Sequence, residues 1–127
     1  MSAEARLGTL RTYLLACERR DISAIAACFE GSARVLDPLG EQNGIGAIRQ
    51  YFESIYKDLA ALSFKTSPVC WCGASCAVSW RGSGRRHDGS GVVYEGVDVF
   101  TFGPDHQIRE LWAFWVPHDL LGSDTLG

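Results

Sequence analysis

The sequence contains no apolar run that approaches the ~20 residues of a membrane-spanning helix, so no membrane association is expected. Residues Met1 to Arg6 have neither the basic start nor the apolar segment of a secretory signal peptide, and the expected location is the cytoplasm. Basic residues are not in excess, because 12 Lys and Arg stand against 15 Asp and Glu, which gives a net charge of −3. Phosphate binding favours a basic surface, so a nucleic-acid partner is not expected either.

The five cysteines are an odd number and lack the spacing of a disulfide framework, so reduced thiols are expected. Cys70, Cys72 and Cys76 lie close in sequence but lack the paired CxxC or HxxxH spacing of a zinc site. Alternate residues of a strand point the same way, which suits core packing as well as metal binding. We expect no metal site and no cofactor.

The overall composition is that of a folded domain. Hydrophobic residues make up 46% of the 127 residues and charged residues 21%, which is ordinary for a soluble globular protein. This length is enough to bury a core without disulfides, and a single domain over residues 1–127 is expected.

Two helices are predicted in the chain up to about Phe29. Residues from about Glu4 to Arg20 predict an amphipathic helix, with apolar positions at Leu7, Leu10, Leu14 and Cys17. Tyr13 lies beside this stripe, and its hydroxyl needs a partner, which a backbone carbonyl or a functional group could supply. Asp21 is a good N-cap for a second helix from Ile22 to about Phe29, which Gly31 would end.

A short strand, Ala33 to Leu36, runs directly into Asp37, and a loop to Gly44 is expected after it. Pro38 and Gly40 turn the chain, which holds the Asp37 carboxylate at the edge of the core. Aspartate before proline most often begins a turn. A carboxylate at such an edge can also be partly buried and serve as a general base, so both interpretations stay open.

A third helix is predicted from Asn43 or Gly44 to about Leu59, with one apolar face made of Ile45, Ile48, Phe52, Ile55 and Leu59. Phe52 is either core or, in a hollow fold, pocket wall. The pattern then changes to β, with strands predicted over Phe64 to Trp71 and Ser75 to Arg81. The glycine-rich stretch Gly82 to Gly91, which contains Arg85 and Arg86, predicts an exposed hairpin loop.

Val92 to Phe102 has the clearest strand pattern, and it places Asp98 on the more apolar face, between Gly96 and Phe100. A buried carboxyl must be paired or protonated, whereas on an edge strand it would reach water. A turn at residues 103–105 leads to a last strand, Gln107 to Val116. In that strand Leu111, Ala113 and Trp115 share one face; Trp112 and Phe114 share the other, which is either covered or offered to a partner subunit.

The order of these elements resembles the NTF2-like superfamily, and within it the bacterial steroid Δ5-isomerase (ketosteroid isomerase) and SnoaL-like branch. The resemblance rests on Tyr13, on Asp37 in Leu-Asp-Pro-Leu-Gly, on Asp98 in Gly-Val-Asp-Val-Phe, and on Ala113-Phe114-Trp115. It implies an α+β fold in which a cone-shaped, curved, mostly antiparallel sheet wraps around three helices. It also implies a homodimer, for which the outward aromatics of the last strand are suited.

By the same resemblance, Asp37 would be the general base that moves a proton between two carbons of a β,γ-unsaturated 3-ketosteroid. Tyr13 and a protonated Asp98 would donate hydrogen bonds to the dienolate oxygen. The substrate would be a small hydrophobic ketone, bound between apolar walls made of Phe29, Phe52, Leu111, Ala113 and Trp115. The chain departs from the pattern where some isomerases have further tyrosines, because we match those positions to Phe29 and Phe52.

Two other functions remain open from the sequence. One is another acid–base enzyme of this fold, such as a SnoaL-like polyketide cyclase or an epoxide-opening enzyme, although a second acid opposite the base has no clear candidate. The other is a binding module without chemistry, in which Asp98 would titrate normally.

Overall fold

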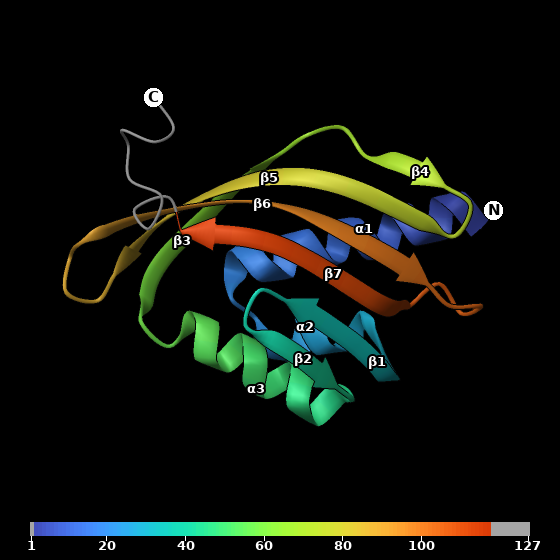
Figure 1. The fold of residues 1–127 in the computed structure, drawn as a ribbon, viewed down its shortest axis with the longest axis horizontal. Helices are drawn as coiled ribbons and strands as arrows, with labels where there is room; N and C mark the ends of the chain where they lie inside the picture. Colours follow the sequence, from blue (N-terminus) through green and yellow to red (C-terminus); the bar gives the residue numbers. More distant parts are fainter. Residues whose placement is uncertain (1, 118–127) are drawn as a thin grey trace.

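The computed structural model describes residues 2–117, which form three helices and seven strands (Figure 1). In chain order these are α1 (Ser2–Arg19), α2 (Ile22–Ala27), β1 (Phe29–Asp37), β2 (Gly40–Asn43), α3 (Ile45–Tyr56), β3 (Leu59–Thr66), β4 (Cys70–Cys72), β5 (Ser75–Arg86), β6 (Gly91–Phe102) and β7 (Ile108–Pro117).

The helices begin and end close to where the sequence predicts. The Asp21 side chain caps α2 by accepting a hydrogen bond of 3.1 Å from the backbone N–H of Ala24. The second helix is shorter than predicted, however, because β1 starts at Phe29 and pairs there with Ile108 of β7. Gly31 is therefore a strand residue, and the prediction that it ends the helix is wrong.

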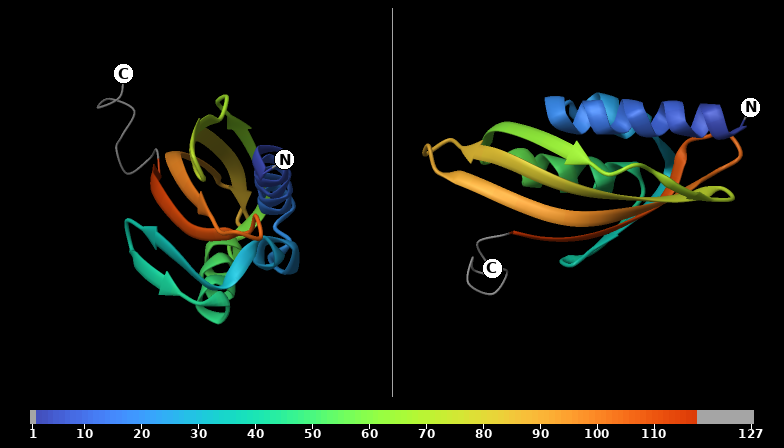
Figure 2. Two further views of the ribbon diagram at one scale, coloured as in Figure 1. Left: turned by 90° about the vertical axis from the view of Figure 1, so that its right-hand side faces the viewer. Right: turned by 90° about the horizontal axis from the view of Figure 1, so that it is seen from above.

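The strands form one sheet in the order β2-β1-β7-β6-β5-β3, with β4 attached to β5. Neighbouring strands are antiparallel except β1 and β7, which are parallel. The sheet is strongly curved and does not close, and α1 and α3 lie along its concave side (Figure 2). Buried side chains of all three helices pack with those of the sheet in a single core cluster. The predicted α+β fold, a curved and mostly antiparallel sheet against three helices, is confirmed.

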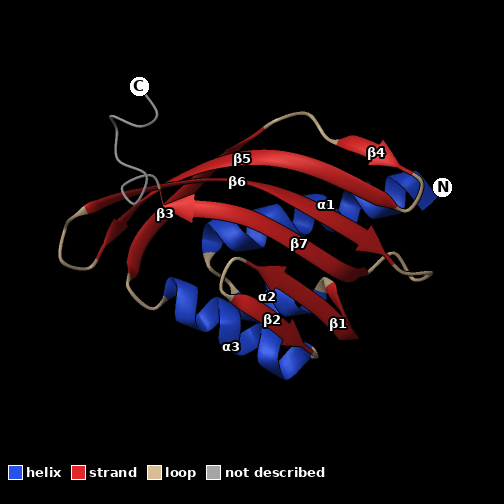
Figure 3. Cartoon of the chain, in the orientation of Figure 1, coloured by secondary structure: helices blue, strands red, loops and turns tan. Residues whose placement is uncertain are grey.

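Three strand predictions need correction, as the ribbon coloured by secondary structure illustrates (Figure 3). The loop expected after Asp37 contains β2, which pairs with β1 although its own sequence is polar. The strand expected from Phe64 to Trp71 is two strands, because residues 67–69 interrupt the β structure between β3 and β4. Residues 82–86 are not loop but the end of β5, held between β3 on one side and β6 on the other.

The two faces of the sheet follow the alternation of the sequence. On β6, Asp98 and Phe100 are buried on the concave face, whereas Val97 is exposed on the convex face. On β7, Leu111 and Ala113 are buried, and Phe114 is 54% exposed. Within residues 2–117 no helix has the length and apolar character that crossing a membrane requires.

Candidate active site

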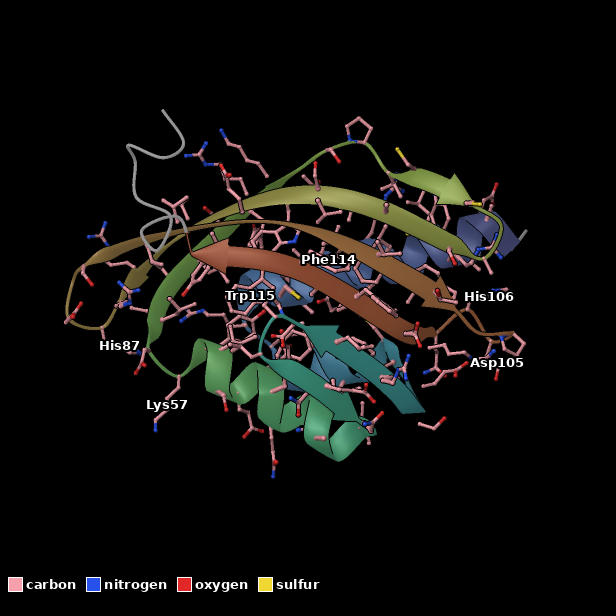
Figure 4. The ribbon with its side chains drawn as sticks, viewed as in Figure 1. Lys57, His87, Asp105, His106, Phe114 and Trp115 are labelled. Carbon is pink, nitrogen blue, oxygen red and sulfur yellow. The ribbon has the colours of Figure 1, made fainter. Side chains whose placement is uncertain are left out.

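A cavity of about 470 Å³ lies between the concave face of the sheet and helices α1 and α3. Its lining is mostly aromatic and apolar and includes Tyr13, Tyr51, Phe52, Tyr56, Phe64, Trp80, Tyr94, Leu111, Ala113 and Trp115. Leu39, Asp58 and Arg86, which are more exposed, lie at its mouth. His87 on the β5–β6 hairpin and Lys57 after α3 lie at this end of the molecule, and Asp105 lies at the opposite end (Figure 4). The cavity has the size and apolar character of a small-molecule site.

The structure brings six of the eight residues proposed from the sequence to this cavity: Tyr13, Phe52, Asp98, Leu111, Ala113 and Trp115. Phe29 does not line it. It packs behind Tyr13 instead, with ring centroids 5.7 Å apart in an edge-to-face arrangement. Asp37 does not line it either, but its carboxylate is hydrogen-bonded to the hydroxyl of Tyr51, which does.

The Asp37 carboxylate is held by three hydrogen bonds. Its Oδ1 accepts from the backbone N–H of Leu39 at 2.9 Å and of Gly40 at 3.1 Å, which is the geometry of an aspartate turn. Its Oδ2 accepts a 2.7 Å hydrogen bond from the hydroxyl of Tyr51, a cavity residue. Asp37 therefore begins the turn and is also connected to the cavity through Tyr51.

Asp98 is the one buried acidic residue within residues 2–117, with 7% of its surface exposed. Its Oδ1 accepts a 3.0 Å hydrogen bond from the indole Nε1–H of Trp80. Burial raises the pKa of Asp98 from its ordinary value of 3.8 to about 7, and the Trp80 hydrogen bond opposes this rise. Of the two readings of the sequence, the buried, paired carboxyl is correct, and near neutral pH it is partly protonated.

Tyr13 lies in an aromatic cluster, with its ring edge-to-face against Phe52 and Phe100 at centroid distances of 6.2 and 5.4 Å. Burial raises the pKa of Tyr13 well above its usual range, and Cys17 and Asp98 add to the rise. The hydroxyl therefore stays protonated and can donate a hydrogen bond to a bound ligand.

The sequence interpretation missed Tyr51, Tyr56 and Trp80. Tyr56 lines the cavity and is a third phenol there after Tyr13 and Tyr51, where only phenylalanines were expected. Burial raises the pKa of Tyr56, and the neighbouring Cys17 adds to this rise, so the phenol stays neutral. Tyr56 follows Phe52 by one helical turn, and this spacing could have identified it. Trp80 follows Cys76 and Val78 at two-residue spacing on β5, so all three side chains lie on the same, concave face of the sheet.

The three cysteines of the expected packing cluster do not converge. Cys70 and Cys72 are exposed on β4, whereas Cys76 is buried on β5 opposite Trp71. Across residues 2–117, no three His, Cys, Asp or Glu side chains are arranged to hold a metal ion.

Comparison with known proteins supports the fold and the family. The model of the SnoaL-like domain matches residues 10–111. The steroid Delta-isomerase of Nocardioides simplex is 33% identical over 123 residues, which cover 95% of this chain and 97% of the relative.

Solved structures of the same architecture include SalBIII, an epoxide hydrolase/cyclase-like enzyme with a role in pyran ring formation in salinomycin. It superimposes with a TM-score of 0.79 at 26% identity, over 91% of this chain and 95% of its own. An NTF2-like protein from Exiguobacterium sp. 255-15 superimposes with a TM-score of 0.74 at 23% identity, over 87% and 98%. With its fold, its hollow aromatic cavity and these matches, the chain belongs to the SnoaL-like domain family.

Proposed function

We propose that this protein is a steroid Δ5-3-ketosteroid isomerase, which moves a β,γ double bond into conjugation with a ketone. The observation that carries the proposal is a buried carboxyl, Asp98, whose pKa is raised to about 7, in the same apolar cavity as the neutral phenol of Tyr13. Two such donors suit an enolate oxygen, because they stabilise the charge that develops there in the transition state. The 33% identity to a steroid Delta-isomerase supports the same reaction.

In the proposed mechanism Asp37 takes a proton from C4 of the substrate and returns it at C6. The electron pair of the broken C–H bond enters the dienolate, whose oxygen accepts hydrogen bonds from Tyr13 and from protonated Asp98. Asp37 acts through Oδ2, the oxygen that meets the cavity wall at the Tyr51 hydroxyl. The other oxygen stays in the turn, where the N–H groups of Leu39 and Gly40 hold it.

Binding of the steroid is assigned to the apolar walls. Leu111, Ala113 and Trp115 come from one face of β7, and Phe52 comes from α3 on the opposite side of the cavity. Phe29 shapes the site indirectly, by packing against the ring of Tyr13.

The test is conversion of 5-androstene-3,17-dione to its conjugated isomer, followed by the absorbance of the enone product. The purified protein should convert it. Its kcat should fall by at least about a hundredfold in Asp37→Asn, which lacks the base. It should fall by at least about tenfold in Asp98→Leu and in Tyr13→Phe, which each lack one donor to the dienolate oxygen. Asp105→Asn, an exposed carboxylate at the far end of the molecule, is the matched control and should leave the rate unchanged (Figure 4). A wild-type protein that binds the phenolic steroid equilenin but converts no Δ5-3-ketosteroid would refute the proposal.

A second candidate is a SnoaL-like cyclase reaction on a polyketide carbonyl compound. It is favoured by the absence of Asp37 from the cavity lining, which leaves Asp98 as the carboxyl that lines the inner cavity and titrates near neutral pH. Such a protein would bind flat polyketide ligands and show no steroid isomerase activity. A non-catalytic binding module is less well supported, because a binding role alone would not require the raised pKa of Asp98.

The convex face of the sheet is the proposed homodimer interface. Val97, Trp112 and Phe114 are exposed on neighbouring strands, and the last two rings contact each other with centroids 6.2 Å apart. An exposed apolar patch on a sheet is typical of an association surface. Phe114→Glu should convert a dimer into a monomer in analytical ultracentrifugation, whereas Leu15→Glu, an exposed apolar position on α1, should not. A wild-type protein that sediments as a monomer at high concentration would exclude this interface.

A further inference from the structure

Trp80 and Asp98 lie on the neighbouring strands β5 and β6 and contact each other diagonally, because they are not directly opposite in the register. In the register of β5 and β6, Trp80 faces Gly96, and Asp98 faces Val78. The diagonal partner is within reach only of a long or aromatic side chain. The indole spans this distance and places its Nε1–H 3.0 Å from Oδ1 of Asp98.

The absence of a side chain at Gly96 leaves room for the indole. A Cβ on Gly96 would lie 2.7 Å from Cζ2 of Trp80 and 2.6 Å from the carbonyl oxygen of Phe114, and one on Gly82 would lie 3.0 Å from Cε1 of Phe64. The ring of Phe64 meets the indole edge-to-face, with centroids 5.5 Å apart and an interplanar angle of 89°. We call this enclosure, formed by Gly82, Gly96 and Phe64, the indole slot. Within it the Trp80 N–H points at Oδ1 of Asp98.

The chemistry of the pair is asymmetric. An indole N–H can only donate, so it binds an oxygen that has a free lone pair. A neutral carboxyl has one carbonyl oxygen, the better acceptor, and one hydroxyl oxygen, which donates. With Oδ1 bound to Trp80, the proton of neutral Asp98 belongs on Oδ2.

We propose that Trp80 is a positioning residue for Asp98: its indole occupies Oδ1, so that Oδ2 carries the proton that a ligand in the cavity accepts. The use of this proton in catalysis rests on the proposed isomerase function, whereas the pairing of Trp80 with Asp98 does not. The indole slot thus determines which of two oxygens faces the reaction.

The other titratable groups that interact with Asp98 are neutral near pH 7. They come from α1, α3 and β5 and are Tyr13, Cys17, Tyr51, Tyr56 and Cys76. Burial raises the pKa of the Cys17 thiol to about 12 and that of Cys76 to about 11, and it raises those of the three tyrosines. A titration near pH 7 in this cluster therefore reports Asp98.

The first test measures the protonation of Asp98 directly, by the ¹³C signals of labelled aspartate carboxyls between pH 5 and 9. Asp98→Asn assigns the signal. Trp80→Phe keeps a ring in the indole slot and removes the donor. The pKa of Asp98 should then rise, because the Trp80 hydrogen bond lowers this pKa in the wild-type protein. Trp112→Phe, on the convex face, is the matched control and should not change it. An unchanged midpoint in Trp80→Phe would overturn the pairing.

A second measurement uses the wild-type protein and remains valid if Trp80→Phe does not fold. The ¹H–¹⁵N signal of the Trp80 indole should move with pH at the midpoint of Asp98 and should stop moving in Asp98→Asn. An indole signal that is insensitive to pH across that midpoint would also overturn the pairing.

Kinetics then separate the inference from the proposed function. For the isomerase, Trp80→Phe should lower kcat at pH 6 about fivefold, the effect of one neutral hydrogen bond, with KM changed less than about twofold. Equal kcat in both proteins would overturn the positioning role. A wild-type protein without isomerase activity, but with the expected shift of the Asp98 midpoint, would refute the proposed function and leave the pairing intact.

Discussion

Asp98→Asn should stabilise this protein, increasingly so as the pH rises. Burial raises the pKa of Asp98 from 3.8 to about 7, so the folded chain keeps a proton there that the unfolded chain has lost. Between about pH 4 and 7, unfolding therefore releases a proton, and the free energy of unfolding falls as the pH rises. The difference of pKa corresponds to roughly 4 kcal/mol once the folded carboxyl is ionised.

Asparagine removes this term and retains an oxygen that can accept the hydrogen bond from Trp80. Between pH 5 and pH 8 the stability of Asp98→Asn relative to wild type should rise by about 3 kcal/mol. For a chain of this size the difference amounts to on the order of 10 °C in Tm, measurable by circular dichroism.

The two proteins should be compared at each pH, so that titration of other groups cancels. Urea unfolding at pH 5, 6, 7 and 8 gives the same comparison as free energies. Parallel stability curves across this range would refute the reasoning, since they would mean that Asp98 ionises as easily in the folded chain as in the unfolded one. The experiment requires no substrate and is independent of the proposed reaction.

Three further predictions concern single contacts. Gly96→Ala should lower the free energy of unfolding by about 1–3 kcal/mol in urea denaturation, because its Cβ would overlap both the indole of Trp80 and the carbonyl oxygen of Phe114; an unchanged midpoint would mean that Gly96 is not enclosed as tightly as the indole slot requires. Tyr51→Phe should cost about 1–2 kcal/mol by the same assay, because the Asp37 carboxylate loses a 2.7 Å hydrogen bond, and a neutral effect would show that this bond contributes nothing. Arg34→Gln, which breaks partly exposed ion pairs with Glu110 and Glu41, should lower the free energy of unfolding by less than about 1 kcal/mol, and a larger loss would mean that these pairs are not solvated surface contacts.

Patterns of residue type predicted the helices and the sheet faces well. The period of α1 and α3 identified their buried sides, and the alternation of β6 placed Asp98 among apolar residues on the concave face. These features are local, because the spacing of side chains along a helix or strand follows from backbone geometry alone. Asp21 as an N-cap is predictable for the same reason.

Elements that depend on a partner strand were missed or misplaced. Gly82 to Arg86 has the composition of a loop, yet it is a strand because β3 and β6 hydrogen-bond to it from both sides. Glycine is useful there: a Cβ on Gly84 would lie 2.7 Å from the carbonyl oxygen of Ala61 on β3. The polar strand β2 likewise exists because β1 pairs with it. Pairing overrides propensity in both cases.

The sequence by itself determined most of the helices and strands, the carboxyl on a buried strand face and the phenol beside an apolar helix stripe, since each follows from residue type and local periodicity. The fold class followed from the resemblance of the order of these elements to the NTF2-like superfamily. Only the tertiary structure decided how these groups are connected. Asp37 meets Tyr51, and Asp98 meets Trp80, through hydrogen bonds between residues 14 and 18 positions apart. The first contact depends on where α3 lies against β1, and the second on the register of β5 against β6 and on the space at Gly96. Neither arrangement follows from the sequence next to these residues.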